Sequence, residues 1–114
     1  MTTETPIESS GWIAVRCIFR STAGDGAQVY EERVTIWQET DADRAIEAAE
    51  READTHATDG DAEFVGLAQA YVLADPPGHG AEIFSLMRDS DLHPDAYVDR
   101  FFDTGTERQG TAHP

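Results

Sequence analysis

The sequence contains no lysine, no asparagine and a single cysteine. One cysteine cannot form an intramolecular disulfide, and the first residues lack the basic start and apolar run of a signal peptide, so we expect a cytoplasmic protein. No apolar run approaches the roughly 20 residues of a membrane-spanning helix, so we expect no membrane partner. Positive charge is also scarce, because eight arginines face 23 acidic residues. The net charge of −15 argues against a nucleic-acid partner.

The 114 residues suffice for one packed core and not for two. Their hydrophobic share of 39% is below the usual globular value, but too high and too well patterned for a wholly disordered chain. We expect one domain over residues 12–103, a disordered tail over residues 1–11 and a second tail over residues 104–114. Two origins fit the bias toward arginine, alanine and acidic residues: a GC-rich coding sequence, which we favour, and adaptation to high salt.

Residues 12–20 and 29–38 each alternate between apolar and other side chains, a pattern that predicts two β-strands. Between them, Asp25-Gly26 is typical of a two-residue hairpin turn of type I′, which needs positive φ at both positions. With Gly24 it forms a short glycine-containing loop that is not a phosphate loop. It joins strand to strand and no lysine follows, so we expect no cofactor.

The two-residue turn fixes the predicted register of the hairpin. It places Val15 opposite Ile36, so that the apolar faces of the two strands coincide. Trp37 would then lie with Arg16 and Arg33 on the opposite face. Together these side chains could hold a carboxylate or an aromatic ligand by hydrogen bonding and stacking, or pack on the sheet and screen it from water, which we favour.

Residues 40–58 have alanines at helical spacing and predict a helix that begins after an N-cap at Thr40 and ends before Gly60. The apolar stripe of this helix has one large side chain, Ile46, so it permits close approach to a sheet. Between residues 39 and 63, ten acidic residues face two arginines. The helix side is therefore expected to be the acidic side of the molecule.

Residues 63–74 and 81–88 predict a third and a fourth strand, separated by a proline-rich turn. Residues 94–102 predict a short C-terminal helix. We therefore expect an α+β fold: a four-stranded antiparallel sheet of order 2-1-3-4, with the main helix on one face. The two helices are too small to cover both faces of such a sheet.

An apolar sheet face without a cover is typical of an interface. We therefore expect a homodimer or a protein partner, and a non-enzymatic protein-interaction module that uses this face. In a narrower version of the hypothesis, the protein is immunity-like and its acidic helix meets a basic partner. The candidate contact residues are Trp12, Arg16, Arg33, Trp37, His79 and Glu82.

His79 and Glu82 also support an alternative function, a small enzyme or a ligand- or metal-binding domain at the turn between the third and fourth strands. His79 lies between two glycines, which leave its imidazole free to act as a base or ligand, but we favour a plain exposed turn. Asp89, Asp91 and His93 have the chemistry of metal ligands at alternating positions. We favour a role in beginning the final helix, and expect no metal.

Five segments carry a resemblance to a known family: WIAVRCIF (12–19), YEERVTIW (30–37), FVGLAQAY (64–71), GHGAEIFSLMR (78–88) and RFFDTGTER (100–108). In them the chain resembles a family of small bacterial proteins classed as domain of unknown function four-two-eight-eight. The resemblance implies a compact bacterial cytosolic domain, and it implies no activity, cofactor or catalytic residue. It also implies that residues 103–108 are ordered rather than part of a tail.

Overall fold

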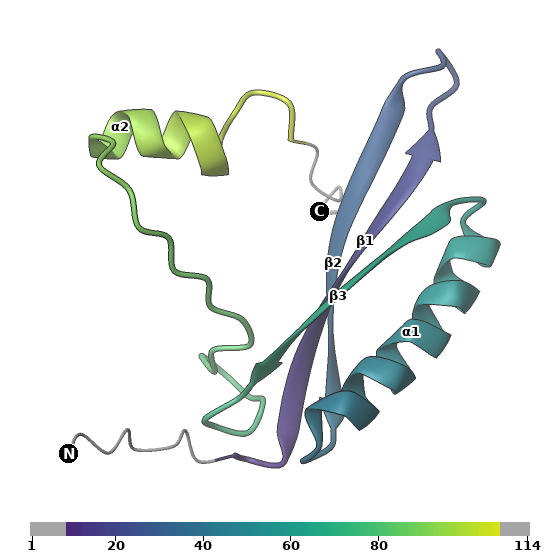
Figure 1. Cartoon of the computed structure of the whole chain (residues 1–114), viewed down its shortest axis with the longest axis vertical. Coiled ribbons are helices and arrows are strands. Elements are labelled where there is room, and N and C mark those ends of the chain that lie inside the picture. Colours follow the sequence, from purple (N-terminus) through teal and green to yellow (C-terminus); the bar gives the residue numbers. More distant parts are fainter. Residues whose placement is uncertain (1–8, 108–114) are drawn as a thin grey trace.

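The computed structural model describes residues 9–107 and has an α+β fold (Figure 1). Three strands, β1 (Trp12–Thr22), β2 (Gln28–Gln38) and β3 (Glu63–Val72), form an antiparallel sheet in the order β2-β1-β3. Helix α1 (Ala42–Asp59) connects β2 to β3 and lies along one face of the sheet. The predicted tails fall mainly on residues 1–8 and 108–114, outside the described residues.

The register of the β1–β2 hairpin differs by one residue from the predicted one, because the turn has three residues instead of two. The amide of Gly26 donates to the carbonyl of Ala23, and the amide of Ala23 donates to the carbonyl of Ala27. Gly26 has a φ of 87°, whereas Asp25 is not among the residues with positive φ. A type I turn closed by one left-handed glycine gives this geometry, and its bulge shifts the pairing.

The shift turns every side chain of β2 to the face opposite to the predicted one. Val15 pairs with Thr35 rather than with Ile36, and Arg16 pairs with Val34. Trp37 pairs with Ile13, on the face that α1 covers. The alternation predicted for β2 is therefore confirmed, but the sides of the sheet assigned to its side chains are exchanged.

The core lies between the sheet and α1. Its buried residues are alternate positions of β1 and one stripe of α1: Ile13, Val15, Cys17, Phe19, Ala45, Ala49, Ala53 and Ala57. Four partly buried side chains pack against them: Trp37, Phe64, Ala68 and Val72. The buried positions of the helix are all alanine, which brings the α1 backbone close to β1. The predicted N-cap at Thr40 is wrong by one residue, because the Asp41 carboxylate accepts the Asp43 amide, at 2.9 Å.

Strand β3 is an edge of the sheet and contains an irregularity. Its pairing with β1 shifts between Cys17 and Phe19, and Gly66 in this stretch has a φ of 97°. A residue with a side chain is strained at such a φ, so the glycine allows a bulge there.

The predicted fourth strand is absent from the sheet in the described part of the chain. Residues 81–88 form neither a helix nor a strand and have no strand partner. Phe84 lies 5.9 Å from Tyr71, between ring centroids, and 4.9 Å from the Arg16 guanidinium of the central strand. The segment therefore crosses a face of the sheet instead of continuing it at the edge of β3.

The C-terminal helix spans the predicted residues and stands apart from the sheet (Figure 1). Its first turn is α2 (Pro94–Tyr97), and its remainder, η1 (Val98–Phe102), is a π-helix. Among the helices and strands of residues 9–107, α2 and η1 contact only each other. Arg88 of the preceding segment donates to the Tyr97 hydroxyl at 3.2 Å and lies over the Phe101 ring. The radius of gyration is 16.7 Å, against about 13 Å for a compact chain of this length.

Candidate functional site

The face of the sheet that turns away from α1 is called here the open face. By the alternation of the strands, it carries Trp12, Ala14, Arg16, Ile18 and Arg20 of β1, Tyr30, Glu32, Val34, Ile36 and Gln38 of β2, and Glu63, Val65, Leu67, Gln69 and Tyr71 of β3. Four of its large apolar side chains are exposed: Tyr30, Ile36, Val65 and Leu67. The open face is thus apolar over much of its area.

Arg16 lies at the centre of the open face and is engaged there. Its guanidinium donates to the side-chain oxygen of Gln69 at 2.6 Å and lies 3.6 Å from the Glu32 carboxylate. The ring of Phe84 covers it from above. With its side chain 19% exposed, Arg16 organises this surface rather than presenting a free charge to a ligand.

One end of the open face is covered by the chain's own residues. Tyr71 donates its hydroxyl hydrogen to Glu82 and contacts the ring of Phe84. The hydrogen bond to Glu82 raises the pKa of Tyr71. Ala14 and Leu73 are fully buried although neither belongs to the core under α1. Of the exposed apolar side chains, Ile36 lies in the same row, on the β2 side of Ala14, and the others lie toward the opposite end of the strands.

The open face has no net charge on its strands, whereas the whole chain carries −15. Two arginines and two glutamates lie on it, and they are joined in pairs, Arg16 with Glu32 and Arg20 with Glu63. The acidic residues of α1 lie on the other side of the sheet. An apolar partner can therefore approach the open face without removing unpaired charges from water.

The face under α1 holds a polar cluster that the sequence pattern does not reveal. Both terminal nitrogens of the Arg33 guanidinium donate to the Glu52 carboxylate, Nη2 to Oε2 at 3.0 Å. The His56 ring nitrogen lies 2.7 Å from a Glu31 oxygen. The hydrogen bonds from Arg33 lower the pKa of Glu52. The spacing of Glu52 and His56, one helical turn apart, is visible in the sequence. Their partners on β2 are not, because the predicted register places Arg33 and Glu31 on the face opposite to α1.

The six predicted site residues do not form one site. Trp12 and Arg16 lie on the open face, whereas Arg33 and Trp37 lie on the face under α1. The Trp37 indole nitrogen donates to the Thr35 hydroxyl at 2.8 Å, and its ring packs on the core. The predicted placement of Arg16, Arg33 and Trp37 on one face is therefore wrong, because the shifted register turns the side chains of β2 to the other side of the sheet.

His79 and Glu82 are exposed at the turn that leaves β3. Glu82 is bound to Tyr71, and the structure shows no hydrogen bond or ion pair between it and His79 over residues 9–107. Farther along, Asp89, Asp91 and His93 are all exposed. No group of three or more His, Cys, Asp or Glu side chains in the described stretch could hold a metal ion.

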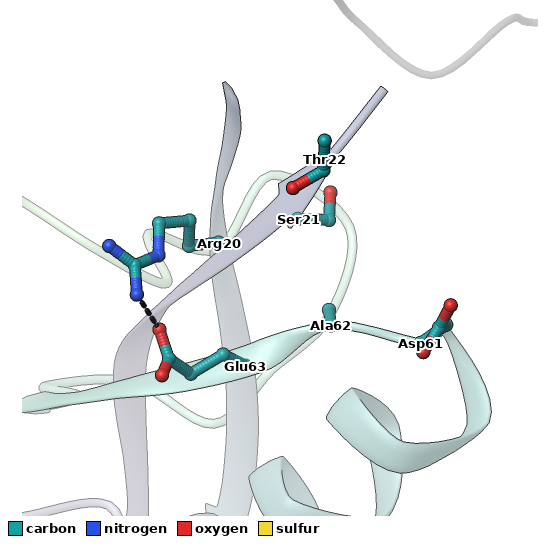
Figure 2. Close-up of a pocket in the computed structure, with 6 residues that line it drawn as sticks. All are labelled: Arg20, Ser21, Thr22, Asp61, Ala62 and Glu63. Carbon is teal, nitrogen blue, oxygen red and sulfur yellow. Dashed lines mark hydrogen bonds and ion pairs between the residues drawn. The ribbon is translucent and has the colours of Figure 1, made fainter. Parts of the chain in front are cut away.

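A shallow hollow of about 380 Å³ lies between the end of β1 and the start of β3 (Figure 2). Arg20, Glu63 and Asp61 line it, with Ser21, Thr22 and Ala62. Arg20 is turned to Glu63 and paired with it, while Asp61 lies at the other side of the hollow. The one cation of the hollow is thus already neutralised, which disfavours an anionic ligand there.

Cys17 lies in the core, 4% exposed. Burial raises the pKa of its thiol, and the carboxylates of Glu50 and Glu52 raise it further. We expect a thiol-specific aromatic disulfide reagent at pH 7.5 to label the folded protein at least about 100-fold more slowly than free cysteine. In denaturant the labelling should be complete and fast. Rapid labelling of the native protein would contradict the buried position of Cys17.

No helix between residues 9 and 107 combines the length and the apolar character that crossing a bilayer requires. Comparison of the chain with family models, with curated proteins and with solved structures finds no match.

Proposed function

We propose that this protein is a protein-interaction module without a catalytic role, which binds another polypeptide through the open face and the segment that follows it. The observation that carries the proposal is the placement of the exposed large hydrophobic side chains. Among residues 9–107 eleven are exposed; four lie on the sheet and seven lie between residues 83 and 102. None lies on α1. Such a one-sided distribution is typical of a binding surface.

The charge distribution supports this mode of binding. An apolar partner is best accommodated where no unpaired charge must be desolvated, and the open face meets this condition through its two ion pairs. The aromatic side chain of Tyr30, 57% exposed, is of the kind that anchors interfaces.

The proposal is tested by one charge placed on the open face. Ile36→Asp changes an exposed side chain in β2, so the fold should be retained. We expect the protein isolated under native conditions from its own cells to elute in a complex, and the variant to lose at least tenfold in affinity for its partner chain. The measurement is light scattering coupled to size-exclusion chromatography, with circular dichroism to verify folding.

Ala42→Asp, at an exposed position of α1, is the matched control and should leave the complex intact. Equal loss of the complex in both variants, or no change in either, would contradict binding through the open face.

A further inference from the structure

We infer that the partner is a second copy of this chain. Within residues 81–102, called here the C-terminal arm, Glu82 and Phe84 stay on the chain's own sheet, and each copy lays the part that follows Phe84 on the open face of the other. This inference rests on the proposed function and specifies the partner.

The C-terminal arm has the properties of a segment whose binding site lies elsewhere. Met87 is 91% exposed and Phe102 is 78% exposed, although both are large and apolar. Residues 81–88 form neither a helix nor a strand, and the helix after them contacts no strand and no part of α1. The arm leads away from the sheet in Figure 1.

The path of the arm disfavours closure onto its own sheet. Gly80, at a φ of 79°, lies in the turn where the Ala81 amide donates to the Gly78 carbonyl. Phe84 is then fixed between Tyr71 and Arg16. These two constraints direct the arm outward, so its exposed residues can reach the uncovered part of an open face on a neighbouring molecule. In two copies related by a twofold axis, each arm can cover the open face of the other copy.

The available area matches a stable dimer. If each of the eleven exposed apolar side chains loses on the order of 70 Å² to solvent, each copy contributes roughly 800 Å². That is the usual contribution of one partner to a standard interface. Neither the arm alone nor the open face alone provides this area, whereas both together do.

The charges also permit a second copy at this face and oppose it elsewhere. Two chains of −15 repel each other, above all through their acidic α1 helices. When two open faces meet with the arms between them, the α1 helices lie on the outside, at least about 30 Å apart. The Debye length at physiological salt is about 8 Å, so this repulsion is largely screened.

The experiment is complementation between two defective variants. Ile36→Asp disables the open face and Phe102→Asp disables the arm. The wild type should have twice the mass of the 12.5 kDa chain, and each variant alone should dissociate at least tenfold more readily. In an equimolar mixture, one intact open face meets one intact arm, so a mixed dimer should reappear. Light scattering and native mass spectrometry measure it, and the milder Met87→Ser serves if Phe102→Asp fails to fold.

The outcomes separate the inference from the proposed function. A wild-type dimer without complementation overturns the arm exchange and indicates that like surfaces meet. A wild-type monomer with its arm closed on its own sheet, detected by protection of Met87 from oxidation, overturns the second copy as partner. The proposed function itself fails if Ile36→Asp leaves every complex from native cells unchanged, or if Ala42→Asp disrupts those complexes equally.

Discussion

Replacing Phe19 by alanine is expected to lower the free energy of unfolding by about 3–5 kcal/mol, the largest loss for any single side chain of the core. Phe19 is 1% exposed. Its ring packs against those of His56, in a T-shaped arrangement, and Phe64, with 4.8 Å and 5.6 Å between the ring centroids. It thus joins β1, β3 and the end of α1. Apart from His56, α1 presents only its buried alanines to this region, and alanines cannot move in to fill the cavity.

Denaturant unfolding followed by circular dichroism measures this loss, at a protein concentration low enough that self-association adds nothing to it. Phe19→Leu is the matched control and should cost about 1 kcal/mol, since leucine retains most of the buried volume. A loss below about 1 kcal/mol for the alanine variant would contradict the position of Phe19 in the core.

Enlarging a core alanine is expected to destabilise the protein almost as much. Ala49 is 1% exposed and lies in the middle of the stripe that α1 packs on β1. In Ala49→Leu, three additional carbon atoms must enter a contact without free space, at an expected cost of about 1–3 kcal/mol in unfolding free energy. Helix propensity does not explain such a loss, because leucine is nearly as favourable as alanine in a helix.

The matched control is Ala42→Leu in the first turn of the same helix, where the alanine is exposed. It should change the unfolding free energy by less than about 0.5 kcal/mol. If the two leucine variants unfold at the same denaturant concentration, the close packing of α1 on β1 is not what the structure indicates.

Much of the fold could be predicted because it depends on local patterns. The alternation in residues 12–20 and 29–38 determines two strands, and the alanine spacing determines α1. The register depended on one detail that the dipeptide Asp25-Gly26 does not reveal. The side chain of Asp25 accepts the Ala27 amide and stabilises a turn in which Asp25 keeps a negative φ, so that the loop has three residues.

The sequence predicted that one face of the sheet would be uncovered, but it did not predict correctly which residues lie on that face. That one sheet face lacks a helix follows from the small number of helices, and the open face bears this out. Which residues lie on it depends on the register, so Arg33 and Trp37 were assigned to the wrong face. The fourth strand was predicted from the apolar pattern of residues 81–88, yet that pattern equally suits a segment that crosses a sheet face, as Phe84 does.

The bulge at Gly66 bears on how many copies can assemble. A flat edge strand can recruit the edge of a neighbour, and the next neighbour after that, which produces fibres of indefinite length. The interrupted pairing of β3 twists this rim and breaks the regular row of amides and carbonyls that such growth needs. Association through faces and arms about a twofold axis ends at two copies, whereas growth along the rim would not end.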